Sequence, residues 1–244
     1  EPMGFYPPRT IAEEAKRLGV GILPPCVNRS EERCTVEYTR DTARDAGNRE
    51  TLAIRLGLGL VRGLQGGGAA AIVRARTAGG PFTSLADFCA RTRLPRPAVE
   101  NLILVRAFDC IGLEVQELLW RLGALPDDVV ADDRGRCCSP TLDYERADEL
   151  VAQLPDLDPL TEVGRVALDL HILGVSTTVN PFKFWRQRME QMGVISSREL
   201  YRKRDGDRVR VAGIVVARAR PPTRTGATAI FISLEDELGL VDVA

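Results

Sequence analysis

The 244-residue chain lacks most features of membrane, secreted and metal-binding proteins. No apolar run approaches the roughly 20 residues that a membrane-spanning helix needs, and the opening residues, EPMGFYPPRT, do not have a signal-peptide pattern. With one histidine and six cysteines, none of them in a C-x-x-C pair, the chain shows no Cys/His zinc motif. We therefore expect reduced thiols and a cytoplasmic location.

Charge is strongly segregated along the chain, although the formal net charge is only -1. Residues 49–106 carry a net charge of +6, residues 127–170 one of -8, and residues 183–224 one of +8. Two basic segments on either side of an acidic one indicate a protein that can bind a polyanion through part of its surface, in spite of its near-neutral total.

Hydrophobic periodicity predicts a mainly α chain with a C-terminal β part. Helices are expected over about 11–18, 85–92, 97–107, 113–123, 159–174 and 180–193. Three pairs have the spacing of capping boxes: Thr10 with Glu13, Ser84 with Asp87, and Ser196 with Glu199. Residues 39–50 are polar and predict a loop. After Arg208 the period changes from 3.6 to 2, which predicts three strands, in RVRVAGIVVARAR, ATAIFISLED and LGLVDVA.

The stretch GLVRGLQGGGAAAIVRAR, residues 59–76, holds five glycines and three arginines. A glycine turn that opens onto a helix exposes backbone amides to a phosphate. Predicted helical flanks, the absence of βαβ alternation and the absence of lysine argue against a dinucleotide fingerprint or a P-loop. We favour a helix-hairpin-helix, in which residues 56–62 lead in, residues 63–67 form the hairpin and residues 69–76 form the second helix. A plain glycine-rich helix connection remains the alternative on spacing alone.

The predicted DNA-binding residues are Arg62, Gly63, Leu64, Gly66, Gly67, Gly68, Arg74 and Arg76. Leu64 is expected to fill the gap between the two helices, and the others to contact phosphates, so binding would not depend on base sequence. No catalytic and no metal-binding residues are predicted. We interpret Asp132–Asp133 as a linker pair and Glu235–Asp236–Glu237 as a turn cluster, because neither offers the acidic set that two-metal catalysis needs.

Four stretches, in this order, resemble the bacterial DNA polymerase III alpha subunit, the C-family replicative DNA polymerase. Residues 2–37 are similar to the end of its fingers domain and residues 54–112 to its helix-hairpin-helix region. Residues 173–182 are similar to its bridge, and residues 208–244 to the first half of its oligonucleotide-binding (OB) fold. The segments FYPP, CTVE and LLWRLG favour the error-prone paralogue, but the choice between the two forms stays open.

The resemblance implies a helix-hairpin-helix domain followed by an incomplete OB β-barrel. The expected domains are the end of the fingers (1–48), the helix-hairpin-helix domain (49–125), an acidic linker (126–158), a helical bridge (159–205) and a truncated OB-fold (206–244). We also expect the chain to be a cut piece of a longer protein.

The function implied is that of the C-terminal DNA-binding portion of a DNA-directed DNA polymerase, a nucleotidyltransferase of replication or error-prone repair synthesis. The catalytic palm and its Mg²⁺ would lie outside this portion, which is itself expected to be non-catalytic. The expected partners are duplex DNA and, at the OB-fold, the single-stranded template. A free-standing nucleic-acid-binding scaffold built from the same modules is the alternative.

The sequence departs from the family pattern in three places. Gln65 stands where the family usually has a glycine, and Asn180-Pro181 where it commonly has His-Pro. The candidate sliding-clamp motif, residues 153–157, lacks the expected aromatic residue. The sequence therefore offers only a weak candidate for binding to a sliding clamp.

Overall fold

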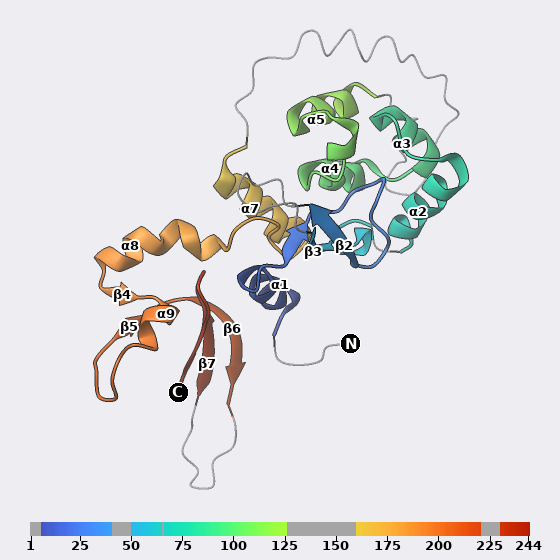
Figure 1. Cartoon of the computed structure of the whole chain (residues 1–244). Helices are drawn as coiled ribbons and strands as arrows, with labels where there is room; N and C mark the ends of the chain where they lie inside the picture. Colours follow the sequence, from blue (N-terminus) through green and yellow to red (C-terminus); the bar gives the residue numbers. More distant parts are fainter. Residues whose placement is uncertain (1–5, 41–49, 65, 126–159, 221–229) are drawn as a thin grey trace. The chain divides into compact units, whose positions relative to one another are not determined.

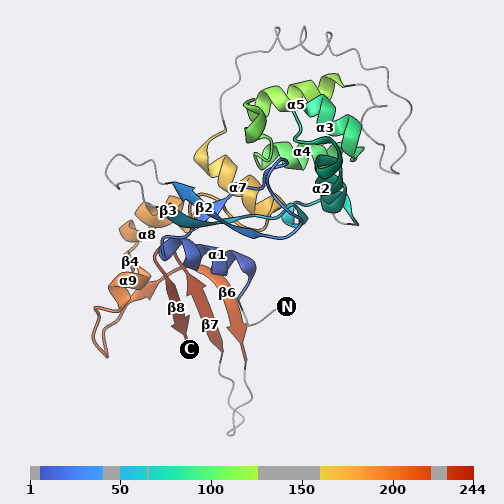
Figure 2. The same cartoon turned by 45° about the vertical axis from the view of Figure 1, so that its right-hand side comes forward.

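The computed structural model describes residues 6–40, 50–64, 66–125, 160–220 and 230–244 (Figures 1 and 2). The chain divides into two compact units, one of residues 22–173 and one of residues 1–21 together with 174–244. Gln65, the Asp132–Asp133 pair and the segment with the candidate clamp motif lie outside the described residues. The predicted class, mainly α with a C-terminal β part, is confirmed. The five-part domain division stays a prediction.

The first unit begins with a small sheet whose two longer strands the sequence did not predict. Its strands are β1 (Gly21–Leu23), β2 (Thr35–Arg40) and β3 (Glu50–Arg55), in the order β1-β3-β2. β2 and β3 are antiparallel, from Thr35 opposite Arg55 to Arg40 opposite Glu50, so the loop predicted over 39–50 is wrong at both ends. These strands lack the alternation of apolar and polar residues that predicts a strand, because an ion pair helps to join them. Arg55 binds both carboxylate oxygens of Glu37, at 2.6 and 2.9 Å.

Helices make up the rest of this unit: η1 (Leu58–Leu60), α2 (Gly68–Gly79), α3 (Leu85–Thr92), α4 (Arg96–Leu104), η2 (Asp109–Ile111), α5 (Val115–Ala124) and α7 (Glu162–Ile172). Figure 1 shows α2 to α5 gathered beside the sheet. Their core contains Phe82, Phe88 and Phe108, with Phe88 edge-on to both others at centroid distances of 4.9 Å. Ser84 caps α3 as predicted, since its hydroxyl accepts from the Asp87 amide.

The helix predicted over 56–62 is only the short 3-10 turn η1, and the segment before it is the strand β3. The amides of Leu58 and Gly59 donate to the Glu31 and Glu32 carbonyls at 2.9 and 3.0 Å, so they do not serve an α-helical ladder. A Cβ on Gly57 would collide with the backbone of Arg33, which fixes glycine at this close approach. The segment before the glycine turn is therefore not an α-helix. Because β2 and β3 are antiparallel, they do not form the parallel βαβ unit that a dinucleotide site requires.

The second unit contains α1 (Pro8–Arg17), η3 (Pro181–Trp185), α8 (Arg186–Gln191), α9 (Ser197–Leu200) and five short strands. β4 (Val194–Ile195) pairs in parallel with β5 (Arg210–Val211). β6 (Ile214–Ala219), β7 (Phe231–Glu235) and β8 (Leu240–Val243) form an antiparallel sheet in that order. Among the described residues this sheet stays open, as an incomplete barrel requires (Figure 2). The Ser196–Glu199 capping box is confirmed.

The capping box predicted at Thr10 is wrong. α1 begins at Pro8, three residues before the predicted start, and the fixed φ and missing N–H of proline suit the first helical position. Thr10 and Glu13 are instead buried, and the Thr10 hydroxyl donates to Glu235 Oε2 at 3.4 Å. The side chain that looked like a cap thus connects α1 to the end of β7.

Candidate nucleic-acid interface

The glycine stretch forms a tight turn between η1 and α2. Gly63, Gly66 and Gly67 have φ values of 93°, 75° and 102°, in the left-handed region that favours glycine. Leu64 is 2 % exposed and packs against Gly68, whose amide donates to the Leu64 carbonyl at 3.1 Å. The chain therefore turns sharply around one buried leucine and enters α2 directly.

The start of α2 is open to a ligand. Its N-cap residue, Gly67, provides no side-chain cap, and the first turn of an α-helix leaves amides, here those of Ala69 and Ala70, without an intrahelical acceptor. A Cβ at Gly66 or Gly67 would meet nothing within 4 Å, so the described residues leave space beside the turn. The partial positive charge of the helix end adds to these amides. This geometry can hold a phosphate oxygen.

Two helices that are distant in sequence support the hairpin. The Asn101 side-chain amide on α4 donates to the Arg62 carbonyl at 2.8 Å. The Arg62 amide donates to the Ile172 carbonyl at the end of α7, at 3.1 Å. Sequence reasoning identified neither partner, because no local pattern relates Asn101 or the end of α7 to the glycine turn.

The three predicted arginines have different surroundings. Arg62 is exposed and its Nη1 lies 3.0 Å from His171 Nε2. Arg74 is exposed on α2 and has no hydrogen-bond or ion-pair partner in the described part of the chain. Arg76 is turned inward: it donates to the Val27 and Ser30 carbonyls at 3.2 and 2.9 Å and pairs with Glu31 at 2.8 Å. Arg62 and Arg74 can therefore reach a ligand, whereas the Arg76 guanidinium holds the turn that follows β1.

Several other arginines of the basic segment 49–106 also have internal roles. Arg91 donates to the Gly80 carbonyl at 2.8 Å and lies over the Phe82 ring, 4.4 Å from its centroid. Arg96 donates to the Leu122 and Leu125 carbonyls at the end of α5, at 2.7 and 3.2 Å. Such arginines satisfy carbonyls at helix ends. The net charge of this segment thus overstates the charge available to a polyanion.

Arg93 is a basic residue near the hairpin that the sequence analysis missed. It is exposed, has a left-handed φ of 51° and ends α3. The next residue, Leu94, packs at the start of α2, with its Cδ2 3.4 Å from the Cβ position of Gly68. The side chain of Leu94 therefore contacts the start of α2 from the segment that follows α3.

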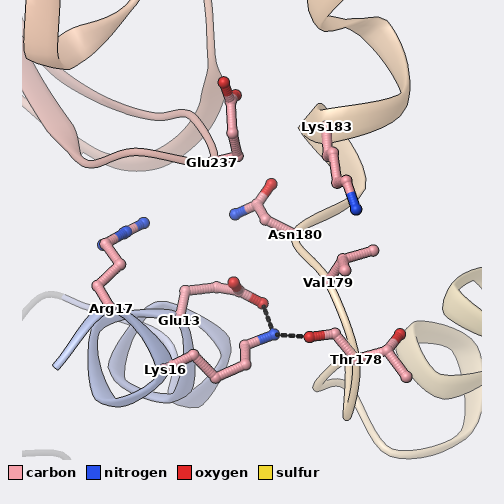
Figure 3. Close-up of a pocket in the computed structure, with 8 residues that line it drawn as sticks. All are labelled: Glu13, Lys16, Arg17, Thr178, Val179, Asn180, Lys183 and Glu237. Carbon is pink, nitrogen blue, oxygen red and sulfur yellow. Dashed lines mark hydrogen bonds and ion pairs between the residues drawn. The ribbon is translucent and has the colours of Figure 1, made fainter. Parts of the chain in front are cut away.

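The second unit contains a pocket of about 290 Å³ between α1, residues 178–183 and the β7–β8 turn. Figure 3 shows the Lys16 ammonium between Glu13 and the Thr178 carbonyl, at 2.7 and 3.3 Å. Arg17 pairs with the fully buried Glu235 at 3.0 Å, and Arg186 pairs with Glu237 at 2.6 Å. Most charges at this pocket are matched within the protein.

Two residues of the acidic run 235–237, Glu235 and Asp236, are buried and form bonds within this unit. Asp236 accepts from the amide and the hydroxyl of Ser197, both at 2.7 Å. Burial acts to raise the pKa of Asp236, but hydrogen bonds from Ser197 and the following amides outweigh it, so its pKa is lowered. Burial also acts on Glu235, where it outweighs the Arg17 hydrogen bond and raises the pKa. Among the described residues, no group of three or more His, Cys, Asp or Glu side chains could hold a metal ion.

Known proteins match both the hairpin and the whole chain. Residues 19–118 match the family model described as a helix-hairpin-helix motif. The chain is 36% identical to an error-prone DNA polymerase of Symbiobacterium thermophilum and 38% identical to one of Mycobacterium bovis, with 100% of the chain aligned in both. It is 35% identical to error-prone DNA polymerase 1 of Agrobacterium fabrum over 99% of its length.

The chain spans only 24%, 20% and 22% of these three relatives. No described helix is long and apolar enough to cross a membrane. The resemblance predicted from four collinear stretches is confirmed by the match over the whole chain, and the relatives carry the error-prone name. The chain contains a helix-hairpin-helix motif and is, over its full length, a homologue of one part of the error-prone DNA polymerases.

Proposed function

We propose that this chain is the C-terminal DNA-binding portion of an error-prone C-family DNA polymerase. In the whole enzyme, nucleotide transfer would take place in a palm domain outside this portion. The part described here would hold the duplex behind the active site through phosphate contacts. A grip of this kind does not read bases, which suits an enzyme that must copy any sequence.

The observation that carries the proposal is the uncapped start of α2 behind two left-handed glycines. The described helices α1, α4, α5 and α8 also lack a side-chain cap, but α2 differs from them because its N-cap residue is a left-handed glycine. The turn leaves open space beside Gly66 and Gly67, where a sugar-phosphate backbone can approach the amides. The helix-hairpin-helix match over residues 19–118 supports the same interpretation.

We assign separate roles to the residues of the hairpin. Gly66, Gly67 and Gly68 bring the amides to the phosphate, while Gly63 and Leu64 shape the turn. Arg62 and Arg74 supply positive charge, and we add Arg93 because it is exposed and precedes Leu94, which packs at the start of α2. Arg76 supports the fold through its bonds to Val27, Ser30 and Glu31, so we do not assign it a phosphate.

The proposal includes no chemical step in this portion. Mg²⁺ would belong to the palm, and the acidic residues described here do not fit it: Glu235 and Asp236 are bound by Arg17 and Ser197. The open sheet β6-β7-β8 is a second, weaker candidate surface, for the single-stranded template. Phe231 is 44% exposed on β7, which suits the stacking of a base.

A pair of glycine substitutions tests the hairpin assignment. Gly67 and Gly19 have φ values of 102° and 83°, and a Cβ at either would meet nothing within 4 Å. Gly67→Val and Gly19→Val should each cost about 1–2 kcal/mol of stability, because a side chain is forced into the left-handed region. Only Gly67→Val should also weaken binding to a random-sequence duplex, which fluorescence anisotropy measures. Equal affinities for the two variants would refute a DNA-binding role for the hairpin.

The reading frame upstream of Glu1 distinguishes the polymerase from a free-standing scaffold. A continuous frame that encodes a palm domain with paired aspartates supports the proposal. A frame without one favours a scaffold protein that uses the same hairpin.

A further inference from the structure

Two cysteines that are distant in sequence meet in the first unit. Cys26 lies in the turn after β1, and Cys110 lies in η2, between α4 and α5. Each thiol is the largest influence on the pKa of the other. The backbones are joined next to them, because the Val27 amide donates to the Ala107 carbonyl at 2.9 Å. The two thiols therefore lie on segments that are themselves connected.

Asn28 fixes the position of this thiol pair. Its side-chain amide donates to Cys110 Sγ at 3.4 Å and to the Phe82 carbonyl at 2.9 Å. Its Oδ1 accepts from the Phe82 amide at 2.7 Å. All the hydrogen-bonding capacity of one side chain thus serves to place Cys110 and the turn that carries Cys26.

The surroundings favour a thiolate on Cys26. The hydrogen bond from the Cys110 thiol lowers the pKa of Cys26 to about 6, against burial, with help from the amides of Asn28 and Arg29 and the charge of Arg55. The pKa of Cys110 is raised, because that thiol is the donor. Cys89 shows the contrast, since burial raises its pKa to about 12. Cys26 is therefore the more acidic thiol of the pair, whereas burial disfavours a thiolate on Cys89.

We propose that Cys26 and Cys110 are a redox-active dithiol, a modification site that hydrogen peroxide converts to an intramolecular disulfide. The Cys26 thiolate attacks one peroxide oxygen, the O–O bond breaks, and a sulfenic acid and hydroxide form. The Cys110 sulfur then attacks the Cys26 sulfur and displaces hydroxide, which takes the Cys110 proton and leaves as water. In total, one thiolate, one thiol and one peroxide become a disulfide, one water molecule and one hydroxide ion.

The bond would tie together the parts that support the hairpin. It would join residues 84 positions apart and enclose β2, β3 and α2 to α4. Cross-linking over so long a loop restricts the unfolded chain and raises stability. The turn that carries Cys26 also holds Arg76 of α2 through the Val27 and Ser30 carbonyls. The oxidised form would therefore keep the hairpin region folded under peroxide stress.

Peptide mapping of the whole chain tests the site. The reduced protein is treated with hydrogen peroxide, its remaining thiols are alkylated, and the digest is analysed by mass spectrometry. We expect a linked Cys26–Cys110 peptide pair, a melting temperature raised by several degrees, and reversal of both by dithiothreitol. Cys26→Ser and Cys110→Ser should each abolish the link and the shift. The matched control, Cys34→Ser, removes another exposed thiol and should keep both.

The same measurement in urea keeps the test independent of how the variants fold. Selective pairing of Cys26 with Cys110 should appear in the native chain and disappear once the chain is unfolded. Separate alkylation of both cysteines after peroxide, or links formed equally with Cys34, Cys137 or Cys138, would overturn the proposal.

Discussion

The side-chain amide of Asn101 donates a 2.8 Å hydrogen bond to the backbone carbonyl of Arg62, and so joins the middle of α4 to the hairpin. This bond positions the turn without adding charge to it. A phosphate site made of backbone amides depends on where those amides are held. The Asn101 hydrogen bond therefore contributes to tight binding, although Asn101 itself does not touch the ligand.

Asn101→Ala should therefore weaken duplex binding several-fold without changing its salt dependence. The variant removes no phosphate-neutralising charge, so the slope of log K against log salt should stay at the wild-type value. Gln187→Ala, on exposed α8, removes the same amide chemistry away from the hairpin and should bind normally. A smaller slope in Asn101→Ala would show that Asn101 contacts the DNA itself.

Arg74→Ala and Arg93→Ala should each reduce the magnitude of the salt slope by about 0.9, the value for one lost phosphate contact. Both side chains are exposed and lack protein partners among the described residues, so stability should hardly change. Salt titration of binding, together with urea unfolding, checks both parts. An unchanged slope for either variant would remove that arginine from the interface.

Arg76→Ala should show the opposite pattern. The loss of its bonds to two carbonyls and to Glu31 should lower the free energy of unfolding by about 1–3 kcal/mol. The salt slope of the folded variant should remain that of the wild type. A lower slope with unchanged stability would mean that Arg76 leaves its internal partners to bind phosphate.

Asp236 should make the second unit sensitive to acid. Its pKa is lowered in the folded state, so its contribution to stability is present above the ordinary value of 3.8 and is lost as the pH falls through the lower folded value. Asp236→Asn should be destabilised by about 1–3 kcal/mol at pH 7, and by progressively less as the pH falls below 3.8. Because Glu235 is present in both proteins, its opposite pH dependence cancels in the difference.

Trp185 on η3 allows this unit to be followed on its own once Trp120 is replaced by Phe. Urea unfolding monitored by its fluorescence, from pH 2.5 to pH 7, gives the difference between Asp236→Asn and the wild type. A difference that stays constant with pH would contradict the assigned role of the carboxylate.

The sheet β6-β7-β8 should be the least protected part of the chain in hydrogen exchange. Within the described ranges, β8 pairs only with β7, and Val243 is 37% exposed. The helices α4 and α5 instead bury Leu102, Ile103, Leu118 and Leu122 at 2% exposure or less. Amides of residues 231–243 should therefore exchange faster than those of residues 97–123. Equal protection would show that the sheet has partners beyond β6 to β8.

Local chemistry explains which parts of the fold were predictable. Ser84 and Pro95 determine where α3 and α4 begin, and both helices begin within one residue of their predicted starts, although α4 ends three residues before the predicted end. Long-range pairing was not readable from the sequence. The strands β2 and β3 depend on the cross-strand Arg55–Glu37 pair, and Thr10 resembled a cap until Glu235, 225 residues later, proved to be its partner.

The candidate site was predictable to a similar degree. The glycine turn and the buried Leu64 follow from the spacing of the motif, since left-handed φ values require glycine. The surroundings of each arginine depend on tertiary contacts that no local pattern contains. Arg76 was therefore grouped with Arg74, although one is turned inward and the other is exposed.

The salt dependence of duplex binding tests the central claim most directly. Affinity for random-sequence duplexes of equal length is measured across a range of salt concentrations. Contacts to about two to four phosphates predict that log K falls linearly with log salt, with a slope of roughly -0.9 per phosphate. Affinity should be the same for unrelated sequences. A flat response to salt, or a strong preference for one sequence, would contradict a phosphate grip by the hairpin.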